Sequence, residues 1–424
     1  MRRFRWRAVV ALAAAVALTA VACGGRDDEG SKEPTKKGAP ATTAGFDGKT
    51  ITLGVITPQT GIASIIGIPL TKGGEVFFKG LNAKGGIAGK YPVKLEIRDS
   101  QYNANTAQQN YSDLRNKVVM IEQILGTDVT NAVLKQMQAD NMVASPATLD
   151  AEWVRDPNLL PVAAPYQIEA INGLSYWVTE GGGEGKTLCA LASDDLYGEA
   201  GLDGVEFAQK DLDFKMGKVV RFDPASSDFS SQVQQLSSGC DAVFLAALPN
   251  ATIALMGTAA TSKLDVRWIG LAPTWVGLLA SGATGSYLKD HFWLAAQGPE
   301  WGDVSVPGMK MMIEDQKKYA PDQKPDLYFA FGYAQAFTVA KLLEKAVERG
   351  DLSHKGIMDA LNELGTVDTM GAAGSYTYGP PEDRKPPEET TIFSVDPAAA
   401  DVGFLKAVKT NYISDAAKKF EFPK

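Results

Sequence analysis

Histidine is nearly absent from this chain of 424 residues, which contains only His291 and His354. Neither lies at a spacing typical of metal ligands, and the Gly-x-Ser-x-Gly motif of a nucleophilic serine is missing. The glycine-rich segment at 181–187 is no phosphate-binding loop, because Glu180 replaces its first glycine and the segment enters a predicted strand. The sequence therefore predicts no catalytic residue, metal or cofactor, and both histidines are expected to cap helices or lie at the surface.

Long hydrophobic runs are also missing, apart from one near the start of the chain. Four arginines precede an uncharged stretch from Ala8 to Ala22, whose 15 residues fall short of the ~20 that a membrane-spanning helix needs. A basic segment, a short apolar segment and small residues form a secretory signal. The following Cys23 makes the pattern resemble the lipobox of bacterial lipoproteins, in which the new N-terminal cysteine is acylated. We expect removal of residues 1–22 and anchoring through Cys23 at the outer face of the cytoplasmic membrane; ordinary secretory cleavage is the alternative.

The exported chain carries an excess of acidic side chains. The full sequence has a net charge of −8, and loss of four arginines with residues 1–22 leaves 402 residues with a charge of −12. This charge excludes nucleic acid and anionic lipid as partners recognised by global charge. A content of 45% hydrophobic residues suits a well-packed protein, and the length favours two lobes over one core. We expect a monomer.

Cysteine is scarce as well, with three in the chain. Acylation of Cys23 leaves Cys189 and Cys240 in a compartment that permits disulfides. Cys189 lies in a predicted strand at 187–192, and Cys240 precedes another at 242–246. If these are the first and third strands of one doubly wound sheet, they are neighbours, and a disulfide between the two cysteines is sterically feasible. Two buried free thiols are the alternative.

Strands and helices alternate after a polar linker. Residues 23–47 are rich in Gly, Pro, Thr and charge, and predict the lipid anchor and a flexible tether. From Thr50 onward, nearly continuous apolar runs predict buried parallel strands, each followed by a helix, and the same rhythm restarts near residue 169. Two such arrays predict an α/β protein with two Rossmann-like lobes, each with a parallel sheet covered on both faces. The last predicted strand lies at 391–395.

Candidate ligand-binding residues follow the predicted strands, because open α/β sheets bind ligands at the carboxyl ends of their strands. Thr127, Asp128 and Thr130 follow one strand and begin a helix, whose free N–H groups favour a carboxylate. Capping of that helix by Asp128 or Thr130 is the alternative role. The next strand ends in a segment of similar chemistry. Its candidates are Ser145, Ala147 and Thr148.

In the second array, Tyr197, Asn250 and Trp275 occupy the matching strand ends. Tyr197 is expected either to cover an apolar ligand or to pack between the lobes. Trp275 is expected either to line the pocket or to pack structurally.

Five short motifs in these loops carry a resemblance to a known family. They are TPQTG at 57–61, LNAKGG at 81–86, SPAT at 145–148, DDLYGEAG at 194–201 and GLAPTW at 270–275. In this order behind a lipobox, they resemble the type I periplasmic solute-binding proteins of the branched-chain amino acid transport group, over residues 48 to about 395. The resemblance implies a hinged receptor without catalytic activity that closes on a small-molecule ligand and delivers it to an ABC permease. Alternatives are a ligand sensor of the same fold and an exported α/β enzyme.

The resemblance also implies a hinge of three crossings, which we expect near 164–169, 297–302 and 368–375. Lobe I then comprises 48–165 and 299–369, and lobe II comprises 166–298 and 370–424. Within the cleft, a ligand carboxylate is expected to meet the Thr127–Thr130 turn and the backbone of Ala147 and Thr148, with Tyr197 over the ligand.

One departure from the family bears on the ligand. Amino-acid binders of the group place an acidic residue near the GLAPTW segment to hold the ammonium group, and this chain has none between Gly270 and Gly277. A buried ammonium without a partner is costly. This departure therefore favours a less polar acid, an amide or another small organic molecule as the ligand, unless Asp128 or Asp194 takes the place of the missing acid.

Overall fold

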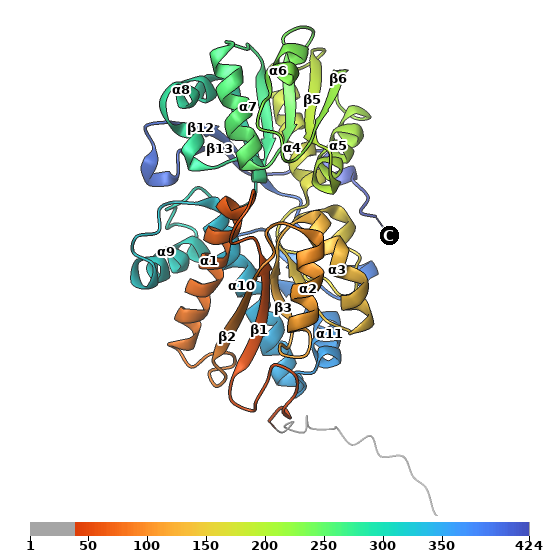
Figure 1. The fold of residues 1–424 in the computed structure, drawn as a ribbon, viewed down its shortest axis with the longest axis vertical. Coiled ribbons are helices and arrows are strands. Elements are labelled where there is room, and N and C mark those ends of the chain that lie inside the picture. Colours follow the sequence, from red (N-terminus) through yellow and green to blue (C-terminus); the bar gives the residue numbers. More distant parts are fainter. Residues whose placement is uncertain (1–38, 424) are drawn as a thin grey trace, which may run out of the picture. The chain divides into compact units, whose positions relative to one another are not determined.

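The computed structural model describes residues 39–423, which form two α/β lobes (Figure 1). The predicted signal at 1–22 and the predicted lipidation site Cys23 lie outside these residues. Within residues 39–423, no helix combines the length and apolar character needed to cross a membrane.

Lobe I contains a four-stranded parallel sheet with the strand order β2-β1-β3-β4. Helices α2 and α3 share a core with one face of the sheet, and α1, α9, α10 and α11 share a core with the other. The elements are β1 Ile51–Thr57, α1 Ser64–Asn82, β2 Val93–Asp99, α2 Ala104–Leu114, β3 Ile121–Ile124, α3 Thr127–Ala139, β4 Ala144–Pro146, α9 Pro307–Tyr319, α10 Leu327–Arg349, α11 His354–Asn362, β10 Thr366–Val367 and β11 Tyr376–Thr377.

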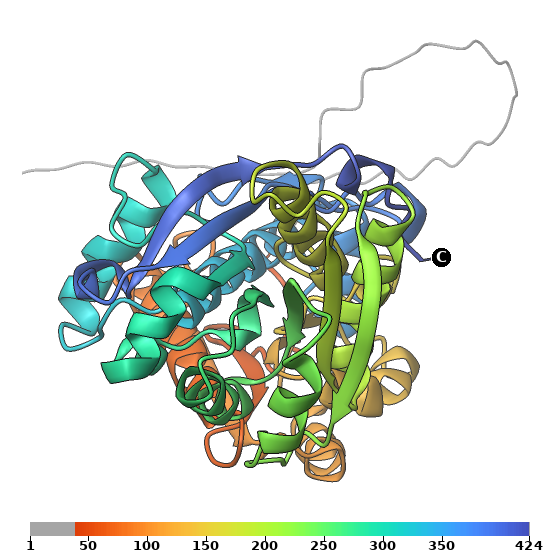
Figure 2. The same ribbon diagram turned by 90° about the horizontal axis from the view of Figure 1, so that it is seen from above.

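Lobe II contains a seven-stranded sheet with the strand order β13-β12-β9-β8-β7-β5-β6. The five strands from β9 to β6 are parallel, and β12 and β13 add antiparallel pairs at one edge, where Figure 2 shows them as a long blue ribbon pair. The elements are α4 Tyr166–Thr179, β5 Thr187–Ser193, α5 Leu196–Gln209, β6 Lys215–Phe222, α6 Ser230–Leu236, β7 Ala242–Ala246, α7 Pro249–Thr261, β8 Arg267–Leu271, α8 Gly282–His291, β9 Phe292–Ala296, β12 Thr390–Val395 and β13 Leu405–Tyr412.

The central strand β5 illustrates why these strands are apolar along their whole length. Leu188 and Ala190 belong to the core formed with α4 and α5, whereas Cys189 and Leu191 belong to the core formed with α6 and α7. Successive side chains of a strand point to opposite faces, so a sheet covered on both faces buries every residue. The predicted α/β fold with helices on both faces of parallel sheets is confirmed.

The edge strand β13 was not predicted. Its residues alternate between exposed and partly buried, and Lys406 and Lys409 stand among them. Charged side chains of this kind protect an edge strand from pairing with other chains. They also give the strand the polar composition of a loop, which is why the sequence pattern did not reveal it.

Two of the segments that join the lobes lie at 161–165 and 297–306. The first ends where α4 begins, and its Ala163 has a φ of +68°, a left-handed conformation that is uncommon for alanine. The second runs from the end of β9 in lobe II to the start of α9 in lobe I.

The third crossing corrects the expected boundary between residues 369 and 370. Strands β10 and β11 pair with each other, and Tyr376 and Tyr378 are buried in the lobe I core with their rings stacked 4.3 Å apart. Farther along, the Nη1 group of Arg384 donates to the carbonyl of Asp156 in lobe I at 2.6 Å. The carbonyl of Glu388 instead accepts from Nδ2 of Asn172 on α4 at 2.8 Å. The chain therefore leaves lobe I between 384 and 388. It stays in lobe I beyond residue 370 because Tyr376 and Tyr378 are buried in the core of that lobe.

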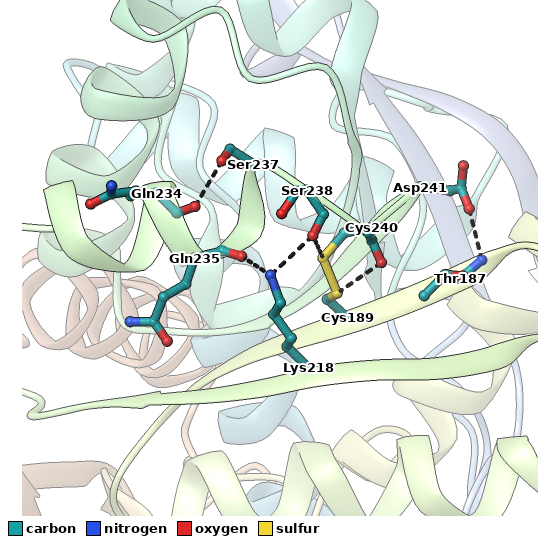
Figure 3. The surroundings of a disulfide bond; sticks show 10 residues. Thr187, Cys189, Lys218, Gln234, Gln235, Ser237, Ser238, Cys240 and Asp241 are labelled. Carbon is teal, nitrogen blue, oxygen red and sulfur yellow. Dashed lines mark hydrogen bonds between the residues drawn. A yellow bond between two sulfur atoms is a disulfide. The ribbon is translucent and has the colours of Figure 1, made fainter.

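A disulfide joins Cys189 of β5 to Cys240, two residues before β7 (Figure 3). These strands are hydrogen-bonded neighbours in the sheet, and the two Cα atoms lie 5.6 Å apart, within the usual range for a disulfide. The side chain of Asp241 accepts from the N–H of Thr187 at 2.8 Å beside the bridge (Figure 3). The pairing follows from strand order, because β5 and β7 are the first and third strands of this lobe.

Candidate functional site

A cavity lies between the two lobes at the carboxyl ends of their parallel strands, and we name it the interlobe cavity. It extends over about 500 Å³ when space open to solvent is counted, of which about 40 Å³ can hold the centre of a water molecule. Lobe I contributes α1, α10 and the turns after β2, β3 and β4, while lobe II contributes the starts of α5 and α7 and the turn after β8. The lining residues are Ile66, Leu70, Tyr102, Leu125, Gly126, Thr127, Ala147, Thr148, Leu149, Tyr166, Tyr197, Leu248, Ala272, Pro273, Gln297, Tyr328 and Phe331.

Two threonine hydroxyl groups form the polar part of the lobe I wall. The Oγ1 atoms of Thr127 and Thr148 lie 2.6 Å apart and share a hydrogen bond. Thr127 is the first residue of α3 and follows Gly126, whose φ of +111° turns the chain from β3 into the helix. The N-terminus of α3, with its free N–H groups and partial positive charge, is thus part of the cavity wall. This combination of donors suits a carboxylate.

Tyr197 of α5 supplies a polar group from lobe II. Its side chain is 2% exposed, and its hydroxyl has no hydrogen-bond partner among residues 39–423. Its ring packs edge-on against Tyr166 with the ring centroids 5.0 Å apart. Burial raises the pKa of Tyr197 well above its ordinary value, so the hydroxyl keeps its proton and remains a donor. A buried donor without a partner is costly, which indicates that a ligand atom completes it.

Three further tyrosines line the cavity and were not selected from the sequence. Tyr102 has a left-handed φ of +57°, directly after Gln101 at +53°, and such strain concentrates at functional sites. Tyr102 follows the end of β2, so the strand-end rule that selected the other residues applies to it as well. Tyr166 and Tyr328 lie near helix starts, where a tyrosine looks like any other core residue of an apolar helix face.

Four of the nine predicted ligand-binding residues line the interlobe cavity, namely Thr127, Ala147, Thr148 and Tyr197. Three others lie inside the lobes. Thr130 is buried in the first turn of α3, and Ser145 donates its Oγ hydrogen to the carbonyl of Leu160 at 2.9 Å. Trp275 packs against Phe292 in lobe II with ring centroids 6.1 Å apart and does not line the interlobe cavity.

The remaining two, Asp128 and Asn250, make contacts between the lobes. Nδ2 of Asn250 donates to the carbonyl of Ile62 at 2.7 Å. Asp128 accepts from the N–H of Leu196, and its pKa is raised by burial and by the nearby charge of Asp195. Because each contact joins one lobe to the other, these side chains hold the lobes together and do not line the ligand space.

A buried carboxyl group lies behind the cavity wall. Oε2 of Glu169 on α4 accepts from the N–H of Ala272 at 3.2 Å, and Oε1 has no partner among the residues described. Burial raises the pKa of Glu169 well above its ordinary value, which favours its neutral form. Amino-acid binders of the resembled group carry an acid near the segment that contains Ala272, and this sequence has none there. The acid that contacts this segment is Glu169 of α4, about 100 residues earlier in the chain. The residues next to Ala272 therefore could not indicate its presence.

The interlobe cavity is lined by uncharged residues. Among residues 39–423, no group of three or more His, Cys, Asp or Glu side chains is placed to hold a metal ion. The site as described can enclose a small, mainly apolar molecule and donate hydrogen bonds to it from both lobes.

Comparison with known proteins agrees with this architecture. Residues 50–401 match the family of periplasmic binding proteins. A fatty acid ABC transporter substrate-binding protein from Thermomonospora curvata has a similar structure, with a TM-score of 0.83 and 25% identity over 91% of this chain and 97% of that chain. No curated protein matches the sequence significantly.

Two more distant structures share the fold. One is a branched chain amino acid ABC transporter protein from Thermus thermophilus with bound valine, at a TM-score of 0.74 and 17% identity over 88% of this chain and 98% of that chain. The other is a leucine binding protein from Thermotoga maritima, at a TM-score of 0.71 and 16% identity over 85% of this chain and 98% of that chain. The resemblance seen in the sequence motifs is confirmed, and the chain belongs to the family of periplasmic binding proteins, with the two-lobed type I fold.

Proposed function

We propose that the protein is an extracytoplasmic substrate-binding protein of an ABC importer, without catalytic activity, and that its ligand is an apolar monocarboxylic acid. The observation that carries the proposal is the interlobe cavity, whose uncharged lining gathers its donors at Thr127, Thr148 and Tyr197. Closure of the lobes buries the ligand, and the closed form is the one that the permease complex recognises.

The carboxylate head fits the polar wall of lobe I. The N-terminus of α3 offers N–H donors and a partial positive charge. One of the hydroxyls of Thr127 and Thr148 donates to the other, which leaves the second as a donor to the ligand. Tyr197 adds a donor from lobe II, and its hydroxyl otherwise lacks a partner. A carboxylate bound in this way contacts both lobes, so it adds interactions that exist only in the closed state.

The rest of the ligand fits an apolar environment. Leu70, Leu125, Leu149, Leu248 and Phe331 line the cavity. An α-amino group would find no acidic side chain in this lining, which includes neither Asp128 nor Asp194. An unpaired buried ammonium group is costly. The similarity to the fatty acid binding protein of Thermomonospora curvata supports the same ligand class.

Octanoate is expected to raise the melting temperature more than octanamide or leucine does, because octanamide lacks the anionic head and leucine carries an ammonium group that finds no acidic partner in the cavity. At 100 times its Kd, it should add about 2.7 kcal/mol of stability. Tyr197→Phe and Thr148→Val should each lower octanoate affinity about tenfold, since each removes one hydrogen bond to a charged group. Differential scanning fluorimetry and isothermal titration calorimetry measure the two effects.

Tyr319→Phe is the matched control for the loss of a hydroxyl, because Tyr319 of α9 lies outside the cavity, and it should bind octanoate like the wild type. Unchanged affinity in both cavity variants contradicts the assigned site. A melting temperature that rises more with leucine than with octanoate would contradict an apolar monocarboxylic acid as the ligand.

We propose that Cys23 carries the lipid anchor and that the residues after it tether a monomeric receptor near its permease, which raises the effective concentration of the two partners. The linker expected at 23–47 ends earlier than that, because Phe46 is buried in the lobe I core. Cys23→Ser should move the protein from the membrane fraction to the soluble fraction of bacterial cells, as measured by immunoblotting after fractionation. Wild-type protein found in the soluble fraction would rule out the anchor while leaving the ligand site untouched.

A further inference from the structure

A second cavity adjoins the interlobe cavity. It extends over about 750 Å³ when space open to solvent is counted, of which about 50 Å³ can hold the centre of a water molecule, and it lies among the segments after β8 and β9, the start of α10 and the end of β12. Gln297, Tyr328 and Phe331 line both cavities. The two spaces therefore share one wall, which we name the shared wall and which consists of these three side chains.

The lining of the second cavity is mostly apolar. Trp275, Met309, Phe393 and Leu405 line it and are 2% to 6% exposed. Asp326 is the acidic residue of the lining, and its carboxylate caps α10 by accepting from the N–H groups of Tyr328 and Phe329 at 2.8 and 3.0 Å. With that carboxylate engaged by the backbone, the cavity suits an uncharged apolar group and not a second polar head.

Of the three side chains in the shared wall, one is held in place by a hydrogen bond and two are not. The hydroxyl of Tyr328 donates to the carbonyl of Trp275 at 2.5 Å, which holds this ring in place. Oε1 of Gln297 is buried without a hydrogen-bond partner among the described residues, and Phe331 has an apolar ring. Rotamer changes at Gln297 and Phe331 would break no side-chain hydrogen bond among the described residues.

We propose that the second cavity receives the distal part of an alkyl chain, so that the protein binds long-chain monocarboxylic acids. The carboxylate and the first part of the chain occupy the interlobe cavity, and the chain passes the shared wall between Gln297 and Phe331. This inference rests on the proposed function. It makes the second cavity the determinant of chain length, because each additional buried methylene strengthens binding about fourfold.

A chain-length series on the wild-type protein tests the inference. Hexanoate, octanoate, decanoate and dodecanoate are titrated by calorimetry below their micelle-forming concentrations. Dodecanoate should bind at least 100-fold more tightly than hexanoate. An affinity that stops rising at octanoate would overturn the inference and leave the proposed function standing, whereas binding of none of the acids would overturn both.

Two substitutions that narrow the second cavity locate the tail. Ala330→Phe and Ala372→Leu add bulk at half-buried positions that line only this cavity, and each should lower dodecanoate affinity at least tenfold while leaving hexanoate affinity unchanged. Ala260→Phe on α7, outside both cavities, is the matched control and should leave both affinities unchanged. Dodecanoate affinity that is unchanged in both variants would place the tail elsewhere and overturn the inference, and hexanoate binding by the same variants shows that they are folded.

Discussion

The wild-type protein is expected to lose stability between pH 4.5 and pH 8, and Glu122→Gln should remove a large part of that loss. Glu122 of β3 is 1% exposed, and its Oε1 has no hydrogen-bond partner among residues 39–423. Burial raises its pKa from 4.5 to about 8. In this range the folded protein holds a proton that the unfolded chain releases. The contribution is therefore complete below pH 4.5 and is lost as the pH rises through 8, by as much as about 5 kcal/mol.

Denaturant unfolding of the wild type and of Glu122→Gln at pH 4.5 and pH 8.5 measures this effect. The wild type should lose several kcal/mol more than the variant between the two pH values. The buried Asp326, whose pKa burial raises to about 6, contributes equally to the pH dependence of stability in both proteins. The difference between their losses of stability therefore reports on Glu122. Glu184→Gln, at an exposed position, is the matched control and should follow the wild type. The same pH dependence in wild type and Glu122→Gln would contradict an ionisation coupled to folding at this carboxyl.

Gly332→Ala is expected to destabilise the protein by about 2–3 kcal/mol, which is typical of overpacking. Helices α1 and α10 approach each other closely at two glycines. A Cβ at Gly332 would lie 2.0 Å from the carbonyl oxygen of Leu70, and one at Gly73 would lie 2.1 Å from that of Phe329. Backbone atoms cannot rotate away as a side chain does, so the two helices would have to separate.

The separation should also weaken ligand binding. Helix α1 carries Ile66 and Leu70, and α10 carries Tyr328 and Phe331, so the two packed helices form neighbouring parts of the cavity lining. Octanoate affinity should fall in Gly332→Ala by more than in a variant of equal stability whose substitution lies in lobe II, far from the cavity. Calorimetry at a temperature where both variants are folded measures the difference.

Gly257→Ala is the matched control, because Gly257 lies inside α7 and an added Cβ there meets nothing within 4 Å. The same exchange should stabilise the protein there by about 0.5–1 kcal/mol, since alanine has less conformational freedom to lose than glycine. A melting temperature raised equally by both substitutions would show that the helices do not pack as closely as described.

Strand positions and their pairing were readable from the sequence for a local physical reason. A strand buried on both faces must be apolar throughout, so runs such as 187–192 are distinctive. The strand order of a doubly wound lobe makes β5 and β7 neighbours. The sequence could therefore indicate that a disulfide between Cys189 and Cys240 is sterically feasible, and the structure contains it. The pattern failed where burial is one-sided, as at β13.

Residues at strand ends were a partial guide to the site. The rule that ligands bind at carboxyl ends selected Thr127, Thr148 and Tyr197, because the end of a strand is a local property. It also selected Asp128 and Asn250, whose partners Leu196 and Ile62 belong to the opposite lobe. Which strand-end residues face ligand and which join the lobes depends on how two separately folded lobes meet.

The sequence by itself determined the two α/β arrays, the family resemblance and the strand ends that surround the cavity, and it predicts an export signal, since each depends on residue types within a short segment. Only the tertiary structure decided that Tyr328 and Phe331 of α10 close that cavity and stand beside a second one, that Glu169 lies behind it, and that the chain returns to lobe II after residue 384. These features are contacts between segments more than 50 residues apart, and an apolar helix face has the same composition whether it covers a core or a ligand.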